Sequence, residues 1–207
     1  MRYTGPKARR VRRQGFNIYG SAKYDKILGR KPYAPGMQAA ERSGRGGKLS
    51  EYGKQLLEKQ KVSSMYGLTD RQLRSVYAKA SRAVGQTDAM MRILLERRLD
   101  NVLYRAGFAL TRLQARQFVS HGLFTVNGVR VTIPSYQIQE GDKIVVRSQR
   151  KGSPVFPPIA AQHEKYLPPS WLSADPGSLT IEVRTLPLEE HVDQAVDMRK
   201  VIGFYSR

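Results

Sequence analysis

The run Gly44-Arg45-Gly46-Gly47-Lys48 is the first place in the chain where chemistry could be encoded, because glycine-rich loops that end in lysine cradle phosphates. A nucleotide-binding loop of that kind also needs a further glycine upstream and a hydroxyl residue after the lysine. Here Arg42 stands at the first of these positions and Leu49 at the second. We therefore interpret the run as a flexible basic loop.

The histidines His121, His163 and His191 are candidate metal ligands, but they lie far apart and the chain has no cysteine. Zinc sites normally combine paired histidines or thiolates at short spacing. The sequence therefore predicts no metal and no cofactor. The lack of cysteine also excludes disulfides and fits a reducing compartment. Residues 1–16 are rich in arginine but lack the apolar stretch of a secretory signal, so the expected localisation is cytoplasmic.

Basic side chains dominate the charged residues, with 36 Lys and Arg against 17 Asp and Glu in 207 residues, a net charge of +19. This excess is larger than solubility requires and predicts a polyanionic partner. Thirteen of the basic residues, but only two acidic ones, lie in residues 1–50. A basic membrane-surface protein would have a similar charge, but the chain has neither a spanning apolar run nor a lipid-inserting helix. Nucleic acid is therefore favoured, and no membrane is expected.

Residues 2–48 mix glycine, proline and basic residues without a sustained apolar period. Such a segment buries little surface to offset the entropy lost on ordering. We expect a basic, largely irregular extension that orders against RNA phosphates. The alternative is a flexible, solvated arm.

Helical periodicity begins after this extension. Ser50 is a candidate N-cap for a helix over residues 50–66. Two capping boxes, Thr69-Asp70-Arg71-Gln72 and Thr111-Arg112-Leu113-Gln114, open helices that end before Gly85 and Gly122. A single further helix is predicted from residue 87 to about residue 106. Basic side chains lie opposite the apolar face of these helices. They could contact phosphates or simply be solvated, and the sequence leaves both interpretations open.

Strand patterns follow the helices. The dipeptide Asn127-Gly128 between residues 123–126 and 129–131 predicts a tight hairpin. Further short strands are predicted at residues 135–139, 143–147, 179–184 and 201–205. The pattern over residues 86–150 is that of a compact module of helices followed by short antiparallel strands.

Residues 94–108, together with Thr111-Arg112, residues 114–117, residues 119–122 and Val126-Asn127-Gly128, resemble an RNA-binding module named after the fourth protein of the small ribosomal subunit. This module is also appended to pseudouridine synthases and tyrosyl-tRNA synthetases. The flanking residues must therefore distinguish the ribosomal family from these enzymes. The flanks resemble the ribosomal family in motifs spread over both ends of the chain: Gly5-Pro6-Lys7, Arg12-Arg13-Gln14-Gly15, residues 31–36, Ser50-Glu51-Tyr52-Gly53, residues 58–61, Tyr66-Gly67, residues 71–74, Pro169-Ser170-Trp171-Leu172 and Phe204-Tyr205-Ser206-Arg207.

The resemblance to the bacterial-type family of this ribosomal protein implies an α+β fold: a helical domain, an inserted small α/β RNA-binding module with two helices and short antiparallel strands, and a basic N-terminal extension. The expected boundaries are 1–48 for the extension, 49–85 and 176–207 for the helical domain, and 86–175 for the module with its proline-rich connector. Some members hold zinc with N-terminal cysteines, which this sequence lacks.

The resemblance further implies a non-enzymatic structural constituent of the small ribosomal subunit. It would bind a multi-helix junction in the 5′ domain of small-subunit ribosomal RNA during assembly. It would also neighbour other ribosomal proteins near the messenger entry channel, influence translational accuracy and contact messenger RNA.

Electrostatic clamping of phosphates is the expected mechanism. The predicted RNA-binding residues are Arg9, Arg10, Arg12, Arg13, Lys48, Lys54, Lys59, Lys61, Arg71, Arg74, Arg82, Arg97, Arg98, Arg105, Arg112, Gln114, Arg116, His121, Asn127, Gly128 and Arg130. For His121, a polar contact or solvated side chain at a helix end is an equal alternative.

Two other classes of protein remain as rivals. Arg98-Leu99-Asp100 is similar to the tripeptide that carries the nucleophilic aspartate of pseudouridine synthases. However, Asp100 lies within an amphipathic helix, where an ion pair on the helix surface is expected, and neither flank of the module leaves room for the usual catalytic domain. A DNA-binding architectural protein is weaker still, because the sequence has no helix-turn-helix signature or minor-groove arm.

Overall fold

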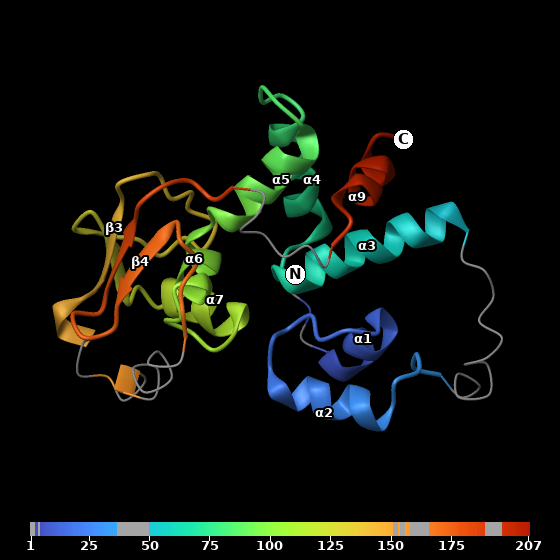
Figure 1. The fold of residues 1–207 in the computed structure, drawn as a ribbon, viewed down its shortest axis with the longest axis horizontal. Coiled ribbons are helices and arrows are strands. Elements are labelled where there is room, and N and C mark those ends of the chain that lie inside the picture. The colour runs from blue at the N-terminus through green and yellow to red at the C-terminus, as the bar shows by residue number, and fades with distance from the viewer. Residues whose placement is uncertain are drawn as a thin grey trace. The chain divides into compact units, whose positions relative to one another are not determined.

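The computed structural model describes residues 3, 5–36, 50–150, 153, 156–157, 166–188 and 196–207. The chain divides into two compact units (Figure 1). The helical unit comprises Met1–Asp88 and Gln194–Arg207, and the sheet unit comprises Ala89–Asp193. Helices and an antiparallel sheet are both present, so the α+β class is confirmed.

The N-terminal extension contains two helices, α1 (Lys7–Gln14) and α2 (Ala22–Arg30). The prediction of a largely irregular extension was therefore wrong over these residues. Two apolar side chains, Val11 and Ile18, are buried and give the segment the packing that its composition does not suggest. Gly15 ends α1 in the left-handed conformation, with φ of 69°, which glycine adopts without steric cost.

Local capping fixes the starts of α3 (Glu51–Met65) and α4 (Asp70–Ala80). The side chain of Ser50 accepts a hydrogen bond from the Gly53 amide. Thr69 and Gln72 form both bonds of the predicted capping box. These two helix starts are therefore confirmed.

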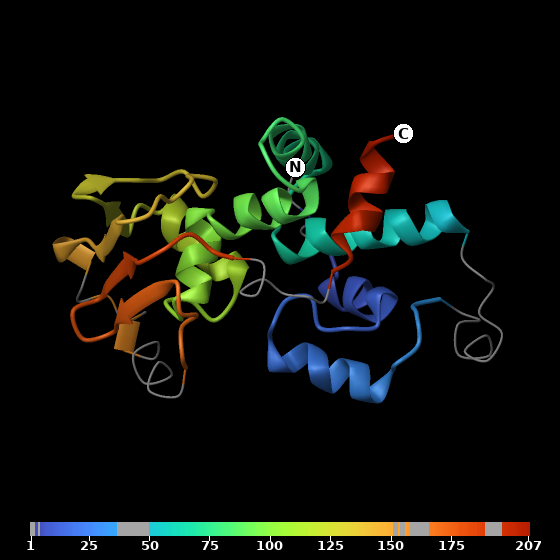
Figure 2. The same cartoon turned by 45° about the horizontal axis from the view of Figure 1, so that its top comes forward.

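The last residues form a helix, α9 (Met198–Tyr205), so the strand predicted at residues 201–205 was wrong. Asp197 caps α9 by accepting a hydrogen bond from the Lys200 amide, and Met198 and Val201 are buried. Helix α9 packs against α3 and α4 within the helical unit (Figure 2). Helical spacing places Phe204 beside Tyr52 and stacks Tyr205 on Tyr77. A strand would have sent these neighbouring rings to opposite faces.

The single helix predicted over residues 87–106 is two helices, α5 (Thr87–Glu96) and α6 (Leu99–Arg105). The break lies at Arg97 and Arg98. There the backbone turns to pair with residues 136–138: the Leu99 amide donates to the Tyr136 carbonyl, and the Ile138 amide donates to the Arg97 carbonyl, both at 2.9 Å. Residues 135–139 form only this isolated bridge, through Gln137, instead of the predicted strand.

The sheet unit contains α7 (Arg112–Ser120), a short 3-10 helix η2 (Ser148–Arg150) and one antiparallel sheet. The strand order is β2-β1-β3-β5-β4. The strands are β1 (Phe124–Val126), β2 (Val129–Arg130), β3 (Lys143–Val146), β4 (Leu172–Asp175) and β5 (Thr180–Val183).

The position of β5 corrects one predicted boundary. Because β5 pairs with both β3 and β4, residues 180–183 belong to the sheet unit and not to the helical domain, where the expected segment 176–207 placed them. Residues of α6, α7 and the sheet share one buried core, which includes Leu103, Phe124 and Trp171. The Asn127-Gly128 hairpin is confirmed, with φ of 50° and 82° at its two corner residues, as a type I′ turn requires.

Candidate nucleic-acid interface

Two buried carboxylates lie at the α5–α6 junction of the sheet unit and organise its arginines. Glu96 is 0% exposed and receives two parallel hydrogen bonds from Arg105, at 2.9 and 3.0 Å. Asp100 is 4% exposed and receives two from Arg98, at 3.0 and 2.8 Å. Such bidentate, charge-assisted pairs fix the plane of each guanidinium.

Arg112 and Arg116, both on α7, join the same network. Arg116 Nη1 lies 3.4 Å from the Asp100 carboxylate. Arg112 Nε donates to the Asn101 side chain at 2.8 Å, and Asn101 in turn donates to Glu96 at 2.7 Å. The Arg112 guanidinium also lies 4.5 Å from the centre of the Tyr104 ring. We call these four arginines, with Glu96, Asp100 and Asn101, the arginine network.

The arginine network brings together four of the predicted RNA-binding residues: Arg98, Arg105, Arg112 and Arg116. Within the network as defined, four arginines are joined to two buried carboxylates. Its members differ in access, since the side chains of Arg105 and Arg116 are 15% and 20% exposed whereas that of Arg98 is 4% exposed. Arg98 is thus a buried partner that holds Asp100 in place. The ion pair of Asp100 is therefore buried, and the prediction that it lies on the helix surface was wrong.

Sequence reasoning missed the anchors of this network. Glu96 and Asn101 were not singled out, and the burial of Asp100 was not foreseen. Their spacing did contain a signal for ion pairing, because Glu96 and Asp100 lie four positions apart, in a run with four nearby arginines. Only their burial, however, distinguishes them from solvent-exposed partners.

The other predicted residues of the sheet unit either hydrogen-bond to its loops and helix starts or are exposed to solvent. Arg97 Nε donates to the Ile138 carbonyl at 2.8 Å. Thr111 caps α7 as predicted, since its side chain accepts from the Gln114 amide at 3.2 Å. The Gln114 side chain, however, accepts from the Leu110 amide and not from the Thr111 amide, so only one bond of the second predicted capping box forms. The Asn127 side chain donates to Asp142 at 2.8 Å and supports the hairpin. His121, Asn127, Gly128 and Arg130 are exposed.

In the helical unit, the predicted arginines are divided between anchored and solvent-facing side chains. Arg10 donates to Ser64 at 3.0 Å and lies 3.5 Å from the centre of the Tyr3 ring. Arg12 donates to the Tyr33 carbonyl and lies over the Tyr33 ring. Exposed arginines lie on α1, on α4 and just after α4: Arg9, Arg13, Arg71, Arg74 and Arg82.

The predicted lysines of the helical unit have acidic partners. Lys54 pairs with Glu51 at 3.2 Å, Lys59 with Asp70 at 2.8 Å and Lys61 with Glu58 at 3.6 Å. Their positive charges are therefore partly offset within the protein. Lys48 lies outside the described residues, as do His163 and His191.

The contact between Asp70 and the C-terminal helix makes a pH-dependent contribution to stability. The hydrogen bond from Lys59, together with one from the Tyr205 hydroxyl, lowers the pKa of Asp70 from its ordinary value of 3.8 despite some burial. Burial, and then the bond to Asp70, raises the pKa of Tyr205 above 10.0. Because the pKa of Asp70 is lowered on folding, its contribution is present above the unfolded value and is lost as the pH falls through the folded value.

We expect Asp70→Asn to lower the free energy of unfolding by at most about 1 kcal/mol at pH 6, since the Asp70 side chain is 53% exposed. The difference from the unchanged protein should shrink as the pH falls below 3.8, because the unfolded state then binds a proton that the folded state binds only at lower pH. Urea unfolding followed by far-ultraviolet circular dichroism at several pH values measures it. Glu140→Gln, which alters an exposed carboxylate of the sheet unit, is the control. A difference that persists unchanged at pH 3 would contradict this account.

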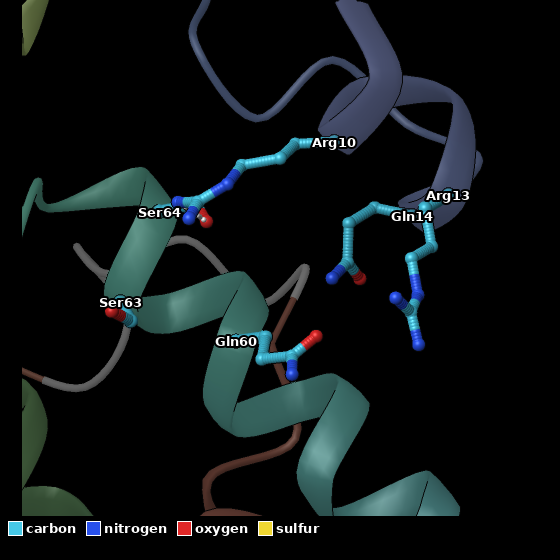
Figure 3. Close-up of a pocket in the computed structure, with 6 residues that line it drawn as sticks. All are labelled: Arg10, Arg13, Gln14, Gln60, Ser63 and Ser64. Atoms are coloured by element: carbon cyan, nitrogen blue, oxygen red, sulfur yellow. Dashed lines mark hydrogen bonds between the residues drawn. The ribbon is translucent and has the colours of Figure 1, made fainter. Parts of the chain in front are cut away.

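A polar pocket of about 280 Å³ lies between α1 and α3 in the helical unit. Figure 3 shows side chains from the two helices facing one another across it. The lining residues are Arg10, Arg13, Gln14, Gln60, Ser63 and Ser64.

Within the described ranges, no three His, Asp or Glu side chains gather as a candidate metal site. None of the helices in the described part of the chain combines the length and apolar character needed to cross a bilayer. Asp100 is engaged by Arg98 and Arg116 and is nearly inaccessible, so it does not resemble a nucleophile poised for substrate.

Comparisons with known proteins cover the whole chain. Residues 97–144 match the S4 domain, and residues 2–96 match the ribosomal protein S4/S9 N-terminal domain. The small ribosomal subunit protein uS4 of Roseiflexus castenholzii is 42% identical over 208 residues, covering 100% of this chain and 99% of the relative. The uS4 proteins of Treponema denticola and Borreliella burgdorferi are 43% and 40% identical, covering 98% and 97% of this chain and 97% and 96% of the relatives.

The S4 domain match begins at Arg97 and covers every member of the arginine network except Glu96, together with the hairpin that follows it. The resemblance noted in the sequence is thereby confirmed over both the module and its flanks. Identity above 40% along the full length of relatives that share one description shows that the chain belongs to the family of the small ribosomal subunit protein uS4.

Proposed function

We propose that this chain is a non-catalytic structural constituent of the small ribosomal subunit that binds small-subunit ribosomal RNA directly. The uS4 family and the S4 domain support this role, and the net charge of +19 supports a polyanionic partner. The localisation that follows is the ribosome, as expected from the sequence.

The observation that carries the proposal is the arginine network. Unpaired arginines on a surface lose side-chain entropy when they bind phosphate. Arg105 and Arg116 are instead held in place by buried carboxylates before RNA arrives. A preorganised, basic surface of this kind suits the fixed phosphate positions of a folded RNA.

Direct phosphate contacts are proposed for eleven of the predicted arginines, and supporting roles for five residues that shape the surface. The proposed direct contacts are Arg9, Arg10, Arg12, Arg13, Arg71, Arg74, Arg82, Arg105, Arg112, Arg116 and Arg130. Lys48, Lys54, Lys59, Lys61 and His121 remain predicted contacts of lesser weight. Arg97, Arg98, Gln114, Asn127 and Gly128 would position the surface, through the bonds described above.

The finer role follows from the resemblance. We propose that the chain binds early in assembly to a multi-helix junction in the 5′ domain of small-subunit ribosomal RNA. Neighbouring ribosomal proteins near the messenger entry channel would be its protein partners, with messenger RNA as a further contact and translational accuracy as the consequence. Chemical footprinting of the RNA with and without the protein would locate the junction, and protection confined to another domain would contradict this part.

The sheet unit is proposed as an RNA-binding module inserted into the helical domain, with the N-terminal extension as a further basic element. In this arrangement the inserted segment returns to the helical domain near Gln194 and not at residue 176. The paired chain segments of the helical unit, α3 and α9, support it.

The direct test compares ribosomal RNA, transfer RNA and duplex DNA in filter binding at matched salt, because affinity for nucleic acid varies steeply with salt. We expect a clear preference for small-subunit ribosomal RNA. Equal affinity for all three would contradict the proposal. Preference for transfer RNA together with turnover of a nucleotide would favour an RNA-modifying enzyme.

Removing one proposed phosphate contact should reduce the salt dependence of binding. We expect Arg112→Ala to weaken ribosomal RNA binding and to make the slope of log affinity against log salt shallower by about 0.7 to 1. Arg184→Ala, which removes an exposed arginine of the same unit outside the proposed set, should leave the slope nearly unchanged. Equal slopes for both variants would remove Arg112 from the contact set.

A further inference from the structure

The pocket between α1 and α3 has a lining that selects for a particular kind of ligand. Among the residues that the structure describes, its lining consists of two arginines and four neutral polar residues, with no carboxylate and no apolar side chain. A cation would meet only positive charge there, and an apolar ligand would leave polar groups without partners. The lining therefore favours an anionic ligand that also carries hydrogen-bonding groups.

One of the two charged side chains in the pocket is held in place. Arg10 is fixed between Ser64, to which it donates at 3.0 Å, and the Tyr3 ring, whose centre is 3.5 Å away. Arg13 follows Arg10 by three residues on α1, and in Figure 3 its side chain lies on the other side of Gln14 from the Arg10 guanidinium. Both arginines line the pocket, and a guanidinium group is suited to binding phosphate.

The neutral part of the pocket offers both donors and acceptors. Ser63 donates its hydroxyl hydrogen to the Leu68 carbonyl at 2.7 Å, which leaves its oxygen as an acceptor. Ser64 accepts from Arg10, which leaves its hydroxyl hydrogen as a donor. Gln14 and Gln60 add amides from facing helices, and every amide carries both kinds of group. A bare phosphate accepts only, whereas the edge of a nucleobase and a ribose hydroxyl present both donors and acceptors.

We propose that this pocket binds one nucleotide of RNA that lies outside a regular helix. The positive charge of Arg10 and Arg13 attracts its phosphate, and Gln14, Gln60 and the two serines contact its ribose or base edge. The volume of about 280 Å³ lies close to the lower end of the range for small-ligand pockets, which is about 300 Å³, and so fits a single nucleotide. Splayed nucleotides in loops and junctions are the usual targets of base-specific RNA recognition. The inference rests on the proposed RNA-binding function and adds to it a specific site.

The test is a charge-matched pair of variants, Gln60→Glu and Gln139→Glu. Each adds one negative charge, but Gln60 lines the pocket whereas Gln139 is exposed in the sheet unit. We expect Gln60→Glu to bind small-subunit ribosomal RNA at least about tenfold more weakly than Gln139→Glu, because a carboxylate would repel the phosphate and lose the amide donor. Gln60→Ala should weaken binding without changing the salt slope, since no charge is removed. Thermal unfolding of each variant checks that the fold is retained.

A photo-crosslinking amino acid at position 60 supplies a second measurement. Crosslinks mapped to one or two unpaired nucleotides are expected. Crosslinks spread over helical RNA, or equal affinities for the two glutamate variants, would overturn the nucleotide site. Normal binding of Gln60→Glu to free RNA with reduced incorporation into small subunits would overturn it in favour of a protein contact. If the unchanged protein does not prefer ribosomal RNA, the proposed function itself fails, and this outcome is separate from all of these.

Discussion

Replacing Asp100 by asparagine is expected to lower the free energy of unfolding of the sheet unit by about 3–5 kcal/mol, the usual cost of removing one partner of a buried ion pair. Asp100 and Arg98 are each 4% exposed, and two hydrogen bonds join them. The amide of asparagine would keep part of the geometry but none of the charge. Arg98 would then remain as a buried cation without its neutralising partner.

The matched control for Asp100→Asn is Glu182→Gln. Glu182 pairs with Lys143 at 2.9 Å on the surface of the same unit, where both side chains are more than half exposed, at 57% and 56%. Its replacement should cost less than about 1 kcal/mol. Trp171 is the only tryptophan of the chain and is 1% exposed in the core of the sheet unit, so its fluorescence follows the unfolding of this unit in urea.

A second substitution separates charge from packing at the same site. Replacing Arg98 by methionine in the Asp100→Asn variant removes the stranded cation and should recover part of the lost stability. If Asp100→Asn lowered the free energy of unfolding no more than Glu182→Gln does, the buried pair of Arg98 and Asp100 would not stabilise the sheet unit as we infer. If the double variant were less stable than the single one, packing of the arginine side chain would outweigh its charge.

Phe124→Ala is expected to lower the free energy of unfolding of the sheet unit by about 3–5 kcal/mol, as buried aromatic residues do when they are truncated to alanine. Phe124 is 0% exposed in strand β1. Its ring lies edge-on to those of Phe108 and Phe156, with each pair of ring centres 6.4 Å apart. Alanine would remove both contacts and leave a cavity beneath α6 and α7, which carry the arginine network.

The control for Phe124→Ala is Val129→Ala on the neighbouring strand β2. Val129 is 68% exposed, so its truncation should change the free energy of unfolding by less than about 0.5 kcal/mol. Both variants are measured by urea unfolding with Trp171 fluorescence. Similar effects for the two positions would show that the aromatic cluster does not anchor this core.

Local signals in the sequence predicted the parts of the fold that local interactions stabilise. The Thr69 capping box and the Asn127-Gly128 turn each involve residues at most three apart, so their geometry depends little on the rest of the chain. The helical period over residues 87–106 failed for the opposite reason. That helix breaks because residues 136–138 return to hydrogen-bond the backbone at Arg97 and Leu99, a contact across about forty residues that periodicity does not encode.

The two ends of the chain were mispredicted because their structure depends on partners elsewhere. Helices α1 and α2 contain few apolar residues, and the burial of Val11 and Ile18 stabilises a segment that composition alone predicts to be irregular. Helix α9 is short and aromatic, like many strands, and its packing on α3 and α4 decides its conformation. In both cases tertiary packing overrides local preference.

By itself, the sequence determined the basic character of the chain, its family resemblance, most helix starts and the hairpin, because charge and short-range geometry are properties of the residues and their close neighbours. Only the tertiary structure decided which arginines are accessible. The burial of Glu96 and Asp100 turns Arg98 into an internal support while leaving Arg105 and Arg116 partly exposed. Burial arises from contacts between segments, so identical residue types in one stretch of sequence acquire different roles.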